Sequence, residues 1–203
     1  MLPDPDRNPW RILASRNVYE NPWIAVEHHE VLKPGGAPGV YGMVRFRNHA
    51  VGVVPVAADG STWLVGQYRL PLGRYSWEIP EGGVPMGEDP VDGARRELRE
   101  ETGVTAAHLL PIQRVALSNS VSDEEGSLFL AWGLTEGEAA PDDTEELRVR
   151  RLPLRQALHM ALSGEITDSL SLIALLRLPL LVSDPATPAE LRRLLAIGLE
   201  AAG

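Results

Sequence analysis

One helix near the middle of the chain constrains the fold most, because its ends and its apolar spacing are both marked in the sequence. Asp89 suits the N-cap, Pro90 suits the first helical position, and Gly103 suits the left-handed residue that follows the last turn. We therefore predict a helix over residues 90–101. Its core face is an apolar stripe at helical spacing, made of Val91, Ala94 and Leu98.

Three glutamates lie on another side of this helix, within an arc of roughly 100°. They are Glu97, Glu100 and Glu101. Like charges four residues apart oppose a helix by about 0.2–0.5 kcal/mol, and the last turn of a helix favours cations. Such violations are expected at functional sites, where Mg²⁺ or Mn²⁺ compensates clustered carboxylates. A solvated acidic face is the alternative interpretation.

Strand patterns surround this helix, and helical patterns follow. The order of strands, one helix, more strands and then helices predicts an α/β fold in layers. We expect a hairpin at Asp59-Gly60 and a short strand that ends in a glycine loop over residues 77–83. The other predicted strands are 23–32, 41–47, 50–57, 62–69, 113–117, 127–134 and 147–152, after an extended arm over 1–16. The remaining predicted helices are 154–163, 169–181 and 188–201.

Composition limits the classes of partner. The net charge of −9 argues against nucleic acid and against anionic membranes, both of which reward a basic surface. No apolar run is long enough to span a bilayer. The first residues lack the basic and apolar regions of a secretory signal, so we expect a cytoplasmic protein. The chain has no cysteine, so oxygen or histidine must hold any metal.

The segment around the helix resembles the Nudix box, Gly-x5-Glu-x7-Arg-Glu-U-x-Glu-Glu-x-Gly-U, in which U is apolar. Every fixed position matches: Gly82, Glu88, Arg96, Glu97, Leu98, Glu100, Glu101, Gly103 and Val104. The motif is long and its spacing is strict, so the signal is specific. The resemblance implies a Mg²⁺-binding loop–helix–loop on an α/β/α sandwich with a mixed sheet.

The same resemblance implies roles for individual residues. Glu97 and Glu101 would be metal ligands, together with the backbone carbonyl of Glu81, and Glu100 would bind a further metal or assist catalysis. Arg96 pairs with Glu100 on the exposed side or reaches back to Glu88, and the sequence leaves both open. Relatives often carry a small residue where this chain has Glu81, but only the backbone oxygen is needed there.

Segments outside the box resemble the ADP-ribose pyrophosphatase branch of the Nudix family: 21–23, 67–69, 77–82 and 164–171. This resemblance covers roughly residues 10–182. It implies Mg²⁺-dependent hydrolysis of a nucleoside diphosphate sugar, with ADP-ribose as the first expectation. It also implies an N-terminal β arm over residues 1–48, which serves dimerisation, before a Nudix domain over 49–203. Because that β region can exchange between subunits in similar proteins, we expect a homodimer.

Two further pairs of residues are candidates for the site. In similar pyrophosphatases a later loop supplies the base, and here Glu145 and Asp143 are the first candidates, with Glu146 beside them. A rival acidic cluster lies at 123–125, in a loop that could equally be a lid. Arg69 and Glu78 are candidates for the substrate, because a guanidinium suits phosphate and a carboxylate suits ribose hydroxyls. A structural ion pair between adjacent strands is the alternative for these two.

Two other functions stay open at this point. The chain could be a Nudix hydrolase of nucleoside triphosphates or dinucleoside polyphosphates, although simple triphosphate members usually lack the N-terminal β region. It could also be a catalytically silent Nudix sensor, although such domains usually lose carboxylates that this box retains. Aromatic residues at 23, 41 and 68 could stack on a nucleobase, but side chains of this kind on strands are more often core.

Overall fold

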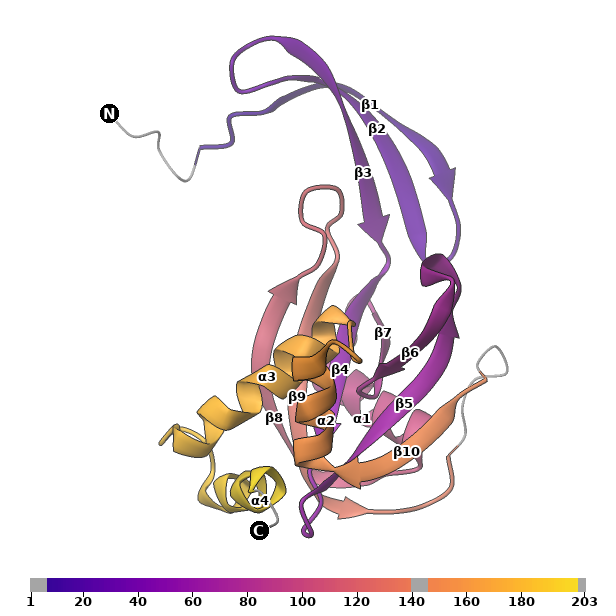
Figure 1. The fold of residues 1–203 in the computed structure, drawn as a ribbon. Coiled ribbons are helices and arrows are strands. Elements are labelled where there is room, and N and C mark those ends of the chain that lie inside the picture. Colours follow the sequence, from indigo (N-terminus) through magenta and orange to yellow (C-terminus); the bar gives the residue numbers. More distant parts are fainter. Residues whose placement is uncertain (1–6, 140–145, 201–203) are drawn as a thin grey trace. The chain divides into compact units, whose positions relative to one another are not determined.

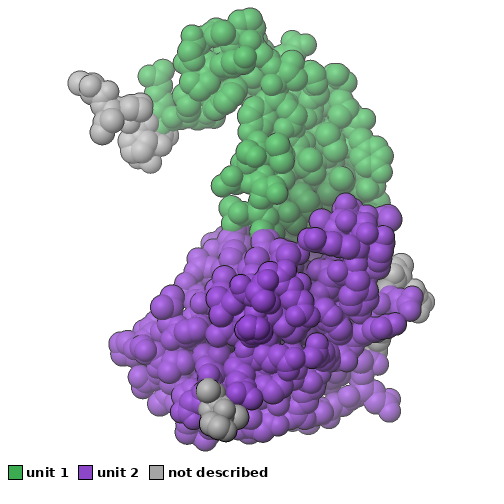
Figure 2. All heavy atoms as spheres, in the orientation of Figure 1, with its two compact units in different colours: residues 1–49, 116–125 green, residues 50–115, 126–203 purple. Residues whose placement is uncertain are grey.

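The computed structural model describes residues 7–139 and 146–200. Two compact units divide the chain, and Figure 2 draws them in green and purple. Unit 1 comprises residues 1–49 with 116–125, and unit 2 comprises residues 50–115 with 126–203.

Unit 1 is built on an antiparallel sheet of three strands in chain order. These are β1 (Arg11–Glu20), β2 (Ile24–Leu32) and β3 (Pro38–Phe46). The prediction of an extended arm up to residue 16 is wrong from Arg11 onward, because β1 pairs with β2 along its length. The 116–125 segment joins this sheet, since the Val44 amide donates to the Val121 carbonyl at 2.8 Å.

Unit 2 carries two further sheets. The first has the order β7 (Glu81–Pro85), β4 (Asn48–Pro55), β9 (Glu125–Thr135) and β8 (Thr105–Ala116). The β4 and β9 strands are parallel, so this sheet is mixed, as predicted. The second has the order β10 (Arg148–Pro153), β5 (Ser61–Arg69) and β6 (Arg74–Glu78), and a 3-10 turn over Leu70–Leu72 precedes β6. The predicted α/β fold class is confirmed.

Two local predictions need correction. Asp59-Gly60 does form a tight turn, in which the Gly60 amide donates to the Ala57 carbonyl at 3.0 Å. The flanking strands nevertheless do not form a hairpin ladder, because β5 pairs with β10 and β6 while β4 pairs in the other sheet. The expected short strand and glycine loop over 77–83 are instead two strands, and Gly82 lies inside β7.

Helices cover both faces of the mixed sheet (Figure 1). Helix α1 (Pro90–Thr102) packs on one face, where Ala94 and Leu98 share a core cluster with Val51 and Val53 of β4. Helices α2 (Leu154–Ser163) and α3 (Ser169–Ser183) lie on the other face, and α4 (Ala189–Leu199) completes the chain. Within the described ranges, no helix is both long and apolar enough to cross a bilayer.

Helix α4 rests directly on the turn between β4 and β5. A Cβ added at Gly198 would lie 3.0 Å from the Gly60 carbonyl oxygen and 3.0 Å from the Leu154 side chain. Leu191 and Leu195 on the same helix are fully buried. The last helix is therefore part of the core of unit 2.

We expect Gly198→Val to destabilise the protein by about 1–3 kcal/mol, because a branched side chain has no room between α4 and the turn. The melting temperature should fall by roughly 2–4 °C for each kcal/mol. The matched control is Ile197→Val, which alters a 41% exposed neighbour and should leave the melting temperature nearly unchanged. Equal melting temperatures for Gly198→Val and wild type would contradict the tight packing.

Candidate active site

Local signals set the ends of α1, as predicted. The Asp89 carboxylate accepts a hydrogen bond from the Val91 amide at 2.9 Å, and Gly103 closes the helix with φ of 74°. Ala94 and Leu98 have no exposed surface, which confirms the predicted core face. Because this face is fixed, the glutamates of α1 are held in a defined direction.

Two of those glutamates meet strand β7. Glu101 is only 3% exposed, and its Oε2 accepts a hydrogen bond from the Glu81 amide at 3.0 Å. Gly82 faces Glu97 so closely that an added Cβ would lie 2.3 Å from the Glu97 Oε2. The carboxylates of Glu97 and Glu101 therefore lie against the backbone of residues 81–82, and a side chain at Gly82 would take the space beside them.

Arg96 braces this arrangement. Its Nη1 lies 2.6 Å from Glu97 Oε1 and 3.4 Å from Glu100 Oε2, and its Nε lies 3.8 Å from Glu88 Oε1. Both pairings that the sequence left open are therefore present. Burial works against the charged guanidinium, but the carboxylates, Glu97 first, raise the pKa of Arg96 above its usual value.

Arg69 and Glu78 form the ion pair that was the alternative to a substrate role. The Arg69 Nε lies 3.0 Å from both Glu78 oxygens, and Nη2 reaches Glu81 Oε1 at 3.2 Å. Glu78 is 3% exposed. Burial opposes the charge of Arg69, but the hydrogen bond and charge of Glu78 raise its pKa, with help from Glu81 and Asp168. Arg69 is thus held in place by two carboxylates.

Asp168 joins this group, and sequence reasoning did not identify it as a site residue. One carboxylate oxygen from each of Glu78, Glu81 and Asp168 lies within 4.8 Å of the others. Asp168 is also the N-cap of α3, since it accepts from the Ser171 amide at 2.7 Å. That N-cap position and the resemblance over 164–171 were the available signals. Burial, then the charges of Asp168 and Glu78, raise the pKa of the Glu81 carboxyl well above its ordinary value.

Glu81→Gln should therefore change how stability depends on pH when divalent cations are chelated. Folded Glu81 holds its proton to higher pH than the unfolded chain does, so the free energy of unfolding of wild type falls as the pH rises above the ordinary range of glutamate. The neutral amide lacks this penalty. We expect the variant to melt above wild type at about pH 8, with the difference shrinking toward about pH 4.

The control for this comparison is Glu165→Gln, which alters an exposed carboxylate after α2. Its melting temperature should differ from that of wild type by the same small amount at both pH values. A Glu81→Gln variant that melts below wild type at high pH would show that the folded state requires the charge of Glu81.

The carboxylates of Glu97 and Glu101 and the backbone carbonyl of Glu81 fit a divalent cation. Their donors are carboxylate and carbonyl oxygens, which are the ligands that Mg²⁺ and Mn²⁺ prefer. The Glu81 Oε2 is buried, and no residue in 7–139 or 146–200 forms a hydrogen bond with it. Gly82 keeps the space beside Glu97 free of a side chain.

The structure gives less support to the residues predicted as the catalytic base. Asp143 and Glu145 lie outside the described residues, and Glu146 is exposed. In the rival cluster, Asp123 accepts from the Phe46 amide at 2.9 Å and pairs with Arg45 at 3.0 Å, all within unit 1. Both oxygens of Asp123 are therefore engaged within its own unit, which favours a structural role for Asp123.

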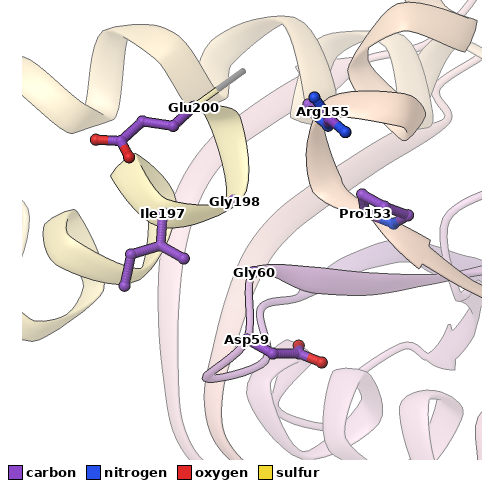
Figure 3. A pocket seen from close by; sticks show the side chains of 7 residues that line it. All are labelled: Asp59, Gly60, Pro153, Arg155, Ile197, Gly198 and Glu200. Carbon is purple, nitrogen blue, oxygen red and sulfur yellow. The ribbon is translucent and has the colours of Figure 1, made fainter. Parts of the chain in front are cut away.

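A hollow of about 280 Å³ lies elsewhere in unit 2 (Figure 3). The turn at Gly60, the start of α2 and the end of α4 surround it. Its lining residues are Asp59, Gly60, Pro153, Arg155, Ile197, Gly198 and Glu200. None of the predicted site residues is among them, so the carboxylates of α1 and β7 remain the candidate site.

Comparisons with known proteins show which family the chain belongs to. Residues 46–171 match the NUDIX domain family, and residues 10–44 match the nucleoside diphosphate sugar hydrolase N-terminal domain. The ADP-ribose pyrophosphatase of Bacillus subtilis is 33% identical over 161 residues, which are 78% of this chain and 86% of that protein. The ADP-ribose pyrophosphatase of Mycobacterium tuberculosis is 29% identical over 182 residues, 88% of this chain and 87% of that protein.

A solved structure, an ADP compounds hydrolase, shares the fold with a TM-score of 0.79 at 21% identity, over 91% of this chain and 100% of that one. The fold and the acidic helix define a pyrophosphate-cleaving hydrolase of the class that uses a divalent metal. The chain belongs to the Nudix family, in its ADP-ribose pyrophosphatase branch, and is a Nudix pyrophosphohydrolase.

Proposed function

We propose that this protein hydrolyses the pyrophosphate bond of a nucleoside diphosphate sugar, with ADP-ribose as its substrate and Mg²⁺ as its metal. The products are a nucleoside monophosphate and a sugar phosphate, and Mn²⁺ is the alternative metal. The observation that carries the proposal is the meeting of Glu97 and Glu101 with the backbone of residues 81–82. The similarity to two ADP-ribose pyrophosphatases over most of the chain supports the choice of substrate.

The proposed ligands are the carboxylates of Glu97 and Glu101 and the backbone carbonyl of Glu81. When bound, the cation neutralises phosphate oxygens and lowers the pKa of water. Arg96 keeps Glu97 in place through its 2.6 Å contact. Glu100 assists at the same helix face, and Glu145 or Asp143 accepts the proton of the attacking water.

Arg69 and Glu78 orient the substrate beside this centre in our proposal. Glu78 and Glu81 already engage the guanidinium of Arg69, so its remaining donors are fixed in direction. A preorganised arginine of this kind binds phosphate with little loss of side-chain entropy. The nearby carboxylates supply acceptors for sugar hydroxyls.

Unit 1 is proposed to hold two chains together as a homodimer, through the arm of residues 1–48. Every residue of β1 is exposed, and so are apolar side chains on β1 and β3 and in the turn between β1 and β2. They include Ile12, Val18, Tyr19, Trp23 and Val40. An exposed apolar edge strand is a template for pairing with another chain.

Light scattering should give twice the mass of one chain for the wild type. A Tyr19→Asp/Trp23→Asp variant should lower this mass, and a monomeric wild type would refute the dimer.

The test of function is turnover of a substrate panel with and without Mg²⁺. The panel holds ADP-ribose, ADP-glucose, GDP-mannose, a dinucleoside polyphosphate and a nucleoside triphosphate. We expect the largest kcat/KM on ADP-ribose and loss of turnover with chelator. Preference for the triphosphate or the dinucleoside polyphosphate would reassign the substrate class. Binding of ADP-ribose with no turnover of any compound would instead indicate a sensor.

A further inference from the structure

Two arginines and three aromatic residues gather on one face of the β10-β5-β6 sheet. Residues directly opposite each other in antiparallel strands point to the same face. Arg148 is opposite Gly66 and Arg150 is opposite Leu64, while Gly66 is opposite Trp77 and Tyr68 is opposite Tyr75. Residues two positions apart on one strand also share a face, so these pairs place all five side chains on the same face. We call Tyr68, Tyr75, Trp77, Arg148 and Arg150 the stacking platform.

Gly66 leaves room for two rings of the platform. A Cβ added at Gly66 would lie 2.4 Å from the Tyr75 hydroxyl and 2.9 Å from Trp77 Cε3. The two rings therefore lie across the backbone of β5, and their centroids are 5.6 Å apart with an edge-on angle of 72°. Any side chain at Gly66 would push both rings away from the strand.

The arginines of the platform are directed at rings and not at carboxylates. The guanidinium carbon of Arg148 lies 6.0 Å from the Tyr75 ring centroid, and that of Arg150 lies 6.0 Å from the Trp77 centroid. Neither arginine forms an ion pair with a carboxylate in residues 7–139 or 146–200. Within the described part of this chain of net charge −9, the two guanidinium groups are a positive feature beside exposed rings.

The platform is open at one end. Leu64 is fully buried, whereas Tyr75 is 41% and Tyr68 is 61% exposed. Trp77 and Glu78 are neighbours on β6 and so point to opposite faces of the sheet. The platform therefore lies on the face of the sheet opposite to Glu78, which we propose for the substrate.

We propose that the stacking platform binds a nucleotide at a second site, outside the hydrolytic centre. The base stacks on the tyrosine rings, since aromatic faces accept any base, and the phosphate binds between Arg148 and Arg150. Charge complementarity favours an anion, because neither guanidinium group pairs with a carboxylate of the described residues. The acidic surface of the rest of the chain selects a small anion over a nucleic acid.

The probe is AMP, titrated with divalent cations chelated, and the readout is the indole N–H resonance of Trp77 in ¹H–¹⁵N spectra. A Trp77→Phe variant assigns that resonance among the five tryptophans. We expect a saturable shift with AMP and weaker responses to adenosine and to inorganic phosphate, each of which offers half of the chemistry. Tyr75→Ala and Arg148→Ala/Arg150→Ala should each weaken AMP binding at least about 10-fold.

The matched control is Arg193→Ala, which removes an exposed arginine of α4 and should leave the affinity for AMP unchanged. An unmoved Trp77 resonance in folded protein at millimolar AMP would overturn the proposal. So would a shift that the arginine variants do not weaken. A shift that requires Mg²⁺ and disappears in Glu101→Gln would place the nucleotide at the carboxylates and equally refute the second site.

Discussion

Glu101→Gln is expected to lower kcat by about 10³-fold on any substrate that the wild type hydrolyses, while the fold persists. Glu101 is 3% exposed and faces strand β7, so the loss of its charge falls on the proposed metal site. The amide of glutamine keeps an oxygen that can accept from the Glu81 N–H, which preserves the contact between α1 and β7. The measurement is single-substrate kinetics over a range of Mg²⁺ concentrations.

The control for this variant is Asp92→Asn, which neutralises an exposed carboxylate in the first turn of the same helix. It should keep wild-type kcat and lose at most about 1 kcal/mol of stability through the helix dipole. If Glu101→Gln retained more than a tenth of the activity at saturating Mg²⁺, Glu101 would not be a metal ligand.

Gly82→Ala is expected to reduce kcat/KM by about 10²-fold, because one methyl group displaces a carboxylate. The added Cβ would lie 2.3 Å from Glu97 Oε2 and 2.4 Å from Glu97 Cδ, so Glu97 must move by about an ångström or more. The change adds no charge and removes no ligand atom. Kinetics and the apparent affinity for Mg²⁺ should both be measured, and both should weaken.

Gly35→Ala is the matched control, since nothing lies within 4 Å of a Cβ added at that turn glycine. It should leave kinetics unchanged. Wild-type kinetics for Gly82→Ala would mean that Glu97 has room to rotate away without leaving its working position, and would count against Glu97 as a ligand.

Helix α1 shows how much of the site the sequence could predict. The bounds of α1, its caps at Asp89 and Gly103 and its core face all agree with the structure. The caps depend on contacts between residues at most four positions apart, and the core face is marked by apolar residues at helical spacing, so a short segment carries the information. The fold class followed from the order of strands and helices, and the Nudix box gave the family.

The pairing of strands that are far apart in the sequence could not be predicted in the same way. A turn signal at Asp59-Gly60 predicted a hairpin, yet β4 and β5 belong to different sheets. A turn specifies the local reversal of the chain, whereas the partner of each strand depends on which distant strand buries its side chains. The continuous apolar run of β4 is buried in a mixed sheet beside β9, more than seventy residues later.

The carboxylate group around Glu81 is the clearest case of what only tertiary structure decides. The sequence by itself determined the acidic face of α1 and the glycine that precedes it, because both are patterns within one short segment. Asp168 lies about ninety positions from Glu78 and meets it only because α3 begins where β6 ends. Burial then raises the pKa of Glu81, and no local pattern encodes burial, since it arises from the packing of the whole unit.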